Sequence, residues 1–298
     1  MNSFAPYYLL FVLTAASAHA ATLDTAKIEQ LTGLKGALNT NENAFKVTSP
    51  RNDLKVSVDG WTMPPFMGLT SWAAFDQGEM ADAVVMGDLV LLQDEVNPVM
   101  SAALDGGLSV TALHNHFFFD DPKVYFMHIW GEDTVEKLAT GVKKALDKVK
   151  EIRAAHPQPA TTFGGPTLPL VNAITAKSLE DILGEKGQTN NGMFKVVIGR
   201  MTRVFEMKME KEMGVNTWAA FAGTDDNALV DGDFAVLEKE LQPVLKSLRN
   251  EGIFIVAIHS HMTDEVPRML FLHYWGRGKA ESLAQSLKKT LDAQKAVK

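Results

Sequence analysis

The sequence predicts an α+β fold made of two tandem copies of one domain, each a mainly antiparallel sheet with helices packed on one face. The first observation behind this prediction is an internal repeat. Residues 85–131 align without a gap on residues 230–276, an offset of 145 positions, with roughly a third of the positions identical. The second observation is that both copies show the same order of alternating segments, typical of half-buried strands, and amphipathic segments, typical of helices.

The repeat keeps chemically distinctive side chains in both copies. The matched pairs include Lys46 and Lys195, Arg51 and Arg200, Trp72 and Trp218, Asp88 and Asp233, and Glu95 and Glu240. Positions that stay identical while their neighbours diverge are positions where both copies need the same residue, for packing or for function. Between the copies, residues 154–170 are rich in Pro and Gly, as linkers are. We therefore expect domains at 22–153 and 171–298.

The expected elements follow one order in each copy. A short helix comes first, at residues 24–31 and 178–183. In the first copy, alternating segments then predict four strands, at 45–48, 54–58, 69–75 and 83–91. A helix at 94–104 follows, then two strands at 108–118 and 123–130 joined by a turn near Pro122, and a closing helix capped by Asp133 and Glu136.

Composition excludes several classes of function. The chain has 298 residues, of which 46% are hydrophobic and 22% charged, as in folded proteins. Its formal net charge of −7 argues against a nucleic-acid partner, because binding phosphates needs a concentrated basic surface. It has no cysteine, which excludes disulfides and thiolate metal ligands. No phosphate-binding loop or dinucleotide fingerprint occurs, so we expect no nucleotide cofactor.

The first twenty residues predict a secretory signal peptide. An apolar segment is followed by Ala18 and Ala20, which form a small-x-small cleavage pattern, with cleavage expected after Ala20 or Ala21. No later segment is long and apolar enough to span a bilayer, so we expect no stable membrane insertion. The sequence therefore predicts a soluble periplasmic or secreted protein.

Each copy carries a His-x-His pair followed by a third histidine. The two sets are His114, His116 and His128, and His259, His261 and His273. Residues i and i+2 of a strand point to the same face, and a hairpin centred near Pro122 would place His128 opposite His116. Three imidazoles on one patch would suit a divalent metal such as Zn²⁺ or Cu²⁺ and would leave coordination positions open. The alternatives are histidines that only pack, or metal-free ligand binding and acid–base chemistry.

Two further pairs of charged residues are weaker candidates for a site. Glu95 and Glu240, at the start of the helix before the histidine strand, would serve as a fourth metal ligand or as a general base. The alternative is a charge stabilised by the helix dipole. Arg51 and Arg200 would bind an anionic group, or would lie at a surface or domain interface.

Two segments around the histidines resemble those of a known family. They are residues 110–116, Val-Thr-Ala-Leu-His-Asn-His, and residues 126–131, Phe-Met-His-Ile-Trp-Gly. With them, the chain resembles the LppY/LpqO family of exported bacterial proteins across both repeats. The function of that family is unassigned, so the resemblance implies no catalytic residue. Some of its members resemble lipoproteins, whereas this chain has no cysteine to acylate, which implies a soluble product.

Three functions fit these features, and the sequence does not decide whether the protein is an enzyme or in which oligomeric state it exists. The first is a binding or accessory protein that holds a divalent metal or a small-molecule ligand at the histidines of each domain. The second is a metal-dependent hydrolase with Glu95 or Glu240 as general base. The third is a structural envelope protein whose histidines only pack.

Overall fold

The computed structural model describes residues 23–297, and the predicted signal peptide at residues 1–20 lies outside them. The fold is α+β with a mainly antiparallel main sheet, as predicted. The first repeat contains, in chain order, α1 (Thr25–Thr32), β1 (Gly36–Asn39), β2 (Ala44–Pro50), β3 (Val56–Val58), β4 (Trp61–Met63), the short helix η1 (Pro65–Met67), β5 (Thr70–Gln77), β6 (Ala83–Leu92), α2 (Gln93–Asp105), β7 (Ser109–His114), β8 (Asp120–Asp121), β9 (Val124–Asp133) and α3 (Val135–Ala155).

The second repeat has the same elements in the same order. They are α4 (Ala176–Leu183), β10 (Gly187–Asn190), β11 (Met193–Gly199), β12 (Thr202–Val204), β13 (Met207–Met209), the short helix η2 (Lys211–Met213), β14 (Asn216–Thr224), β15 (Asn227–Leu237), α5 (Glu238–Asn250), β16 (Phe254–His259), β17 (Glu265–Val266), β18 (Met269–Gly278) and α6 (Ala280–Lys295). None of the helices between residues 23 and 297 is long and apolar enough to cross a membrane.

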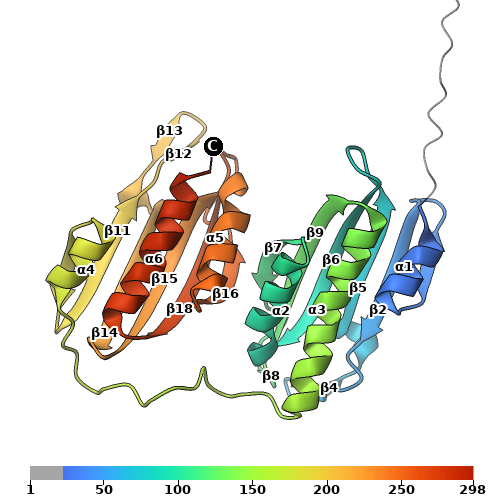
Figure 1. The fold of residues 1–298 in the computed structure, drawn as a ribbon, viewed down its shortest axis with the longest axis horizontal. Coiled ribbons are helices and arrows are strands. Elements are labelled where there is room, and N and C mark those ends of the chain that lie inside the picture. The colour runs from blue at the N-terminus through green and yellow to red at the C-terminus, as the bar shows by residue number, and fades with distance from the viewer. Residues whose placement is uncertain (1–22, 298) are drawn as a thin grey trace, which may run out of the picture.

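The two repeats share one sheet of twelve strands. Its order is β1-β2-β5-β6-β9-β7-β16-β18-β15-β14-β11-β10, so the second half is the first half in reverse (Figure 1). The halves join where β7 and β16 run antiparallel, with Leu113 opposite Ile258. The domains are therefore continuous through the sheet, with an approximate two-fold axis between β7 and β16.

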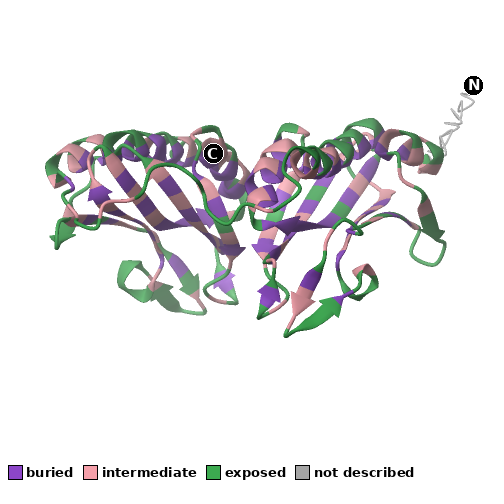
Figure 2. Cartoon of the chain, turned by 90° about the horizontal axis from the view of Figure 1, so that it is seen from below, coloured by how far each residue is buried: buried purple, intermediate pink, exposed green. Residues whose placement is uncertain are grey.

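Figure 2 shows the helices gathered on one side of this sheet and smaller hairpin structures on the other. The small sheets are β4-β3-β8 in the first repeat and β13-β12-β17 in the second. Strand β6 is buried from both sides because its side chains alternate. Leu89 and Leu91 contribute to the large helix-covered core, whereas Val90 and Leu92 contribute to a smaller core beneath β3 and β4. The histidines belong to the face that carries the small sheets, since His116 stacks on Phe126 of that smaller core.

The hairpin that carries the histidines differs from the predicted one. Strand β7 ends at His114, and the chain then leaves the main sheet, so that Asp120 and Asp121 pair with β3 instead. A bulge between Val110 and Ala112 shifts the register, which places Ala112 opposite His128. The expected pairing of His116 with His128 was therefore wrong. The closing helix is capped by Thr134, whose side chain accepts a hydrogen bond from the Lys137 amide, and not by Asp133.

Candidate metal centre

Three strands and one loop bring Asp233 and the second set of histidines together. On the main sheet, His273 of β18 lies between two neighbours, Asp233 of β15 on one side and Ala257 of β16 on the other. His259 lies two residues beyond Ala257 and so points to the same face. His261 belongs to the loop after β16 and folds back over this face, with its ring stacked on Phe271.

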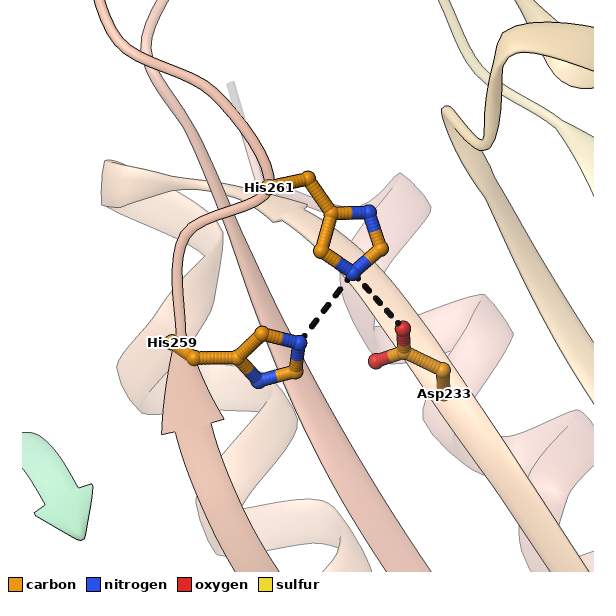
Figure 3. Close-up of side chains that lie close together, drawn as sticks. All are labelled: Asp233, His259 and His261. Atoms are coloured by element: carbon orange, nitrogen blue, oxygen red, sulfur yellow. Dashed lines mark hydrogen bonds and ion pairs between the residues drawn. The ribbon is translucent and has the colours of Figure 1, made fainter.

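The side chains of His259, His261 and Asp233 converge on one point (Figure 3). Nε2 of His261 lies 3.1 Å from Nε2 of His259 and 3.3 Å from Oδ2 of Asp233. Each residue offers one ligand atom, and these atoms all lie within 4.8 Å of one another. The ring of His273 is stacked on that of His259, with 5.0 Å between centroids. The group therefore consists of one carboxylate and two imidazoles, with a third imidazole beside them.

Backbone carbonyls fix the orientation of two of the rings. Nδ1 of His261 lies 3.3 Å from the carbonyl oxygen of Gly214, and Nδ1 of His273 lies 3.2 Å from that of Gly232. A carbonyl oxygen only accepts, so each Nδ1 carries a hydrogen, and in the neutral ring Nε2 then keeps its lone pair. Histidines that ligate a metal are commonly oriented in this way, by a hydrogen bond from the other ring nitrogen to a backbone carbonyl.

The centre contains buried polar atoms that have no hydrogen-bond partner. With its hydrogen on Nδ1, His261 directs a lone pair toward the carboxylate of Asp233. That carboxylate is 2% exposed, and its other oxygen, Oδ1, is buried without a hydrogen-bond partner. Nδ1 of His259 is also buried without a partner. Buried polar atoms without partners are costly, and a bound cation at the convergence point would remove the repulsion between the lone pairs.

The observed spacing suits a small divalent cation. A tetrahedral Zn²⁺ with bonds of about 2.0–2.1 Å holds its ligand atoms about 3.3 Å apart. The separations of 3.1 Å and 3.3 Å between the ligand atoms of His259, His261 and Asp233 fit these tetrahedral edges. Imidazole and carboxylate ligands together favour Zn²⁺ or Cu²⁺ over Ca²⁺ and Mg²⁺, which prefer oxygen ligands alone.

The first repeat gathers the corresponding residues less tightly, since among the described residues only Asp233, His259 and His261 have three ligand atoms within 4.8 Å of one another. His128 of β9 lies opposite Asp88 of β6, and His114 lies at the end of β7. The ring of His114 is 5.2 Å from that of His116 and 5.2 Å from that of His128, measured between centroids. Asp88 is 8% exposed, and its Oδ1 is buried without a partner, as in Asp233. The three imidazoles therefore gather as the sequence predicted, although through the loop after β7 and not through a regular hairpin.

Burial favours the neutral form of one histidine in each set. It lowers the pKa of His259 below the ordinary value; Asp233 opposes this effect, and the imidazoles of His273 and His261 add to it. Only the neutral ring offers a lone pair to a metal, so the lowered pKa of His259 favours coordination at neutral pH.

In the first repeat, burial likewise lowers the pKa of His116, with Asp88 opposing the shift and His114 and His128 adding to it.

A family model described as Domain of Unknown Function (DUF1259) matches residues 26–148 and 177–293. The chain belongs to the DUF1259 family. The two matches confirm the tandem duplication. None of the curated proteins compared with the chain matches it. Among solved structures, it is similar to a trimeric bacterial microcompartment shell protein, PduB, at 9% identity, over 87% of this chain and 89% of that one, with a TM-score of 0.21.

The sequence patterns did not identify the aspartates of the two DUF1259 domains as residues of the site. The repeat matched Gly87-Asp88 with Gly232-Asp233, which was a usable signal. It did not point to the histidines, because 26 or more residues separate each aspartate from them and only strand pairing brings them together. The carboxylate of each candidate centre comes from β6 or β15, in the middle of its domain.

The predicted carboxylates, Glu95 and Glu240, lie elsewhere. Glu95 is fully buried, and its two oxygens accept hydrogen bonds from the Arg51 guanidinium at 2.7 Å and 2.9 Å and from the Leu92 amide at 2.8 Å. Nε of Arg153 lies 2.9 Å from the same carboxylate. The structure thus places Glu95 in a buried ion-pair network at the start of α2, and not among the histidines.

The second DUF1259 domain repeats this network. The carboxylate of Glu240 accepts hydrogen bonds from Arg200 at 3.0 Å and 3.1 Å, from the Leu237 amide at 2.9 Å and from Gln294 at 2.8 Å. It is likewise not brought to the histidines.

Arg51 and Arg200 form hydrogen bonds and ion pairs with these buried carboxylates. The five N–H groups of Arg51 are distributed over Asp53, Glu95 and the carbonyl oxygen of Val90. No donor is left for an external anion, because a guanidinium has five N–H groups in all. Arg200 makes the corresponding contacts with Glu240 and with the carbonyl oxygen of Ala235, and is less deeply buried. The anion-binding role predicted for Arg51 is therefore not supported by its contacts.

Proposed function

We propose that the protein is an exported binding or accessory protein that holds a divalent metal, Zn²⁺ or Cu²⁺, in each of its DUF1259 domains. The observation that carries this proposal is the convergence of Nε2 of His259, Nε2 of His261 and Oδ2 of Asp233 on one point, where each of the three atoms could serve as a metal ligand.

In the second domain, Asp233, His259 and His261 would ligate the metal, and Nε2 of His273 is the nearest further donor. In the first domain the corresponding residues are Asp88, His114, His116 and His128. Any coordination position that the protein leaves free would accept water or a small ligand.

The unpartnered atoms support metal binding over packing. Histidines that only hold strands together are expected to have their buried nitrogens hydrogen-bonded. Here Nδ1 of His259 and one oxygen each of Asp88 and Asp233 are buried without partners. A cation bound at Oδ2 of Asp233 would compensate the charge of the buried carboxylate, whereas a packing role leaves that burial unexplained.

The contacts of the glutamates favour a binding protein over the predicted hydrolase. A general base acts on a metal-bound water only from hydrogen-bond distance. Glu95 and Glu240 are engaged by arginines and backbone amides, so neither is free to take a proton from such a water.

Export is part of the proposal. It rests on the signal-peptide pattern at residues 1–20 and on the resemblance to the exported LppY/LpqO proteins. Mass spectrometry of the protein from its native host is expected to find an N-terminus at Ala21 or Thr22. Mature material that retains Met1 would contradict it.

Metal uptake by the untagged protein tests the part of the proposal that concerns metal binding. After dialysis against a chelator, the protein is titrated with Zn²⁺ or Cu²⁺, and bound metal is counted by elemental analysis. We expect up to two ions per chain in the wild type, with one lost in His261→Ala and the other lost in His116→Ala. His156→Ala, in the linker, is the matched control and keeps both. Wild-type protein that takes up no metal would exclude the proposal.

A further inference from the structure

A hollow lies beside the second-domain metal centre. It has a volume of 480 Å³, within the range of small-molecule sites. Three lysines line it, Lys186, Lys195 and Lys211, together with Gly214, Trp218 and a single acidic residue, Glu212. Three cations around one hollow stand out in a chain whose net charge is −7.

The hollow and the metal centre share two residues. The carbonyl oxygen of Gly214 orients the ring of His261, at 3.3 Å from Nδ1. The ring of Trp218 lies edge-on to His273, with 6.4 Å between centroids. A molecule in the hollow would therefore lie next to the residues that orient the metal ligands.

The three lysines differ in their ion pairs. Lys186 is paired with Glu180 at 2.7 Å. Lys195 and Lys211 make no ion pair with any residue in the range 23–297 that the structure describes. The Lys195 ammonium instead lies over the ring of Trp218, 4.2 Å from its centroid, which holds it at the hollow.

We propose that this hollow binds an oxyanion, the carboxylate or phosphate group of a small ligand, between the ammonium groups of Lys195 and Lys211. The ligand would extend over Trp218 toward the metal at His259, His261 and Asp233. Its contact with the metal rests on the proposed function, whereas its contact with the two lysines does not.

The first domain provides an internal comparison. Lys46 lies over Trp72 at the same distance, 4.2 Å, as Lys195 over Trp218. The short helix that begins with Lys211 in the second domain begins with Pro65 in the first. At this matched position the second domain has a lysine and the first has a proline, so the proposal assigns the oxyanion to the second domain.

Calorimetric titration of the metal-free full-length protein with inorganic phosphate, and separately with acetate, tests the proposal at constant ionic strength. Binding of phosphate, of acetate or of both supports it and identifies the preferred group. Lys195→Met and Lys211→Met keep the aliphatic part of the side chain and remove the charge, so each is expected to weaken binding at least tenfold. Lys46→Met, the matched control in the first domain, is expected to bind like the wild type.

The proposal is overturned if the wild type binds neither anion, or if Lys46→Met weakens binding as much as Lys195→Met does. Circular dichroism of each variant verifies that it is folded. Metal uptake is measured on the same preparations. Metal uptake without anion binding would sink this inference and leave the proposed function standing, and anion binding without metal uptake would do the reverse.

Discussion

Asn97 and Gln242 occupy the same position in the two repeats, and each binds the edge strand of the other repeat through its side-chain amide. Asn97 accepts from the Ile255 amide at 2.7 Å and donates to the Ile255 carbonyl at 3.0 Å. Gln242 does the same with Val110, at 3.0 Å and 2.8 Å. These reciprocal bonds flank the pairing of β7 with β16, so both histidine clusters lie near the junction of the two domains.

Replacing Asn97 by Ala is expected to destabilise the fold by about 2–3 kcal/mol, because both polar groups of Ile255 would lose their partner at a buried position. Urea unfolding measures the change. Asn41→Ala, at an exposed turn, serves as the control and is expected to change stability by less than about 0.5 kcal/mol. An unchanged free energy of unfolding in Asn97→Ala would show that these bonds do not hold the domains together.

Replacing Asp233 by Asn keeps the size of the side chain and removes the charge that faces His261. We expect the affinity of the second centre for Zn²⁺ to fall at least tenfold, with the first centre unaffected, as measured by calorimetric titration. Asp231, two residues earlier on the same face of β15 and opposite Trp275, is the matched position for a control. Equal losses in Asp231→Asn and Asp233→Asn would mean that general charge, and not ligation, attracts the metal.

Metal affinity is expected to depend on pH with a definite sign. Protons compete with the metal for the imidazoles, so acid releases the ion. Because burial lowers the pKa of His259, its ring is protonated at lower pH than an ordinary histidine, and binding is expected to weaken as the pH falls. Dissociation constants for Zn²⁺ at several pH values between 8 and 5 measure this. Affinity that rises on acidification would be incompatible with histidine ligands.

Replacing Glu95 by Gln separates the ion-pair network from the metal centre. The change leaves Arg51 with a poorer buried partner and is expected to cost about 3–5 kcal/mol of stability. Metal stoichiometry, measured by elemental analysis at low temperature on folded protein, is expected to stay the same. Glu240→Gln is the companion variant, since its partner Arg200 is less deeply buried and the protein is expected to be less destabilised. Loss of one metal ion per chain in either variant would indicate that the replaced glutamate is a metal ligand after all.

Local patterns predicted much of the fold. The ungapped repeat identified the duplication, and the strand and helix order agrees with alternation and capping signals, as in the helix Thr25–Thr32 that Asp24 caps. The histidines were recognised because both copies keep them at the same spacing. These signals are local or come from comparing the chain with itself, so they need no knowledge of strand pairing.

What the sequence did not predict depends on long-range pairing. The bulge after Val110 and the departure of the chain after His114 decide which residue faces His128. The sheet that continues from β7 to β16 arises between two edge strands, and neither edge carries a local signal of its partner. Long-range pairing also places Asp88 and Asp233 beside the histidines, because β6 pairs with β9 and β15 pairs with β18.

The most direct test of the central claim is anomalous diffraction from crystals of the untagged protein grown with Zn²⁺ and measured above and below the zinc absorption edge. We expect an anomalous peak between Nε2 of His259, Nε2 of His261 and Oδ2 of Asp233, at about 2.0–2.2 Å from each ligand atom. Zinc peaks confined to surface side chains, with no peak at this point in crystals that contain the ion, would contradict it.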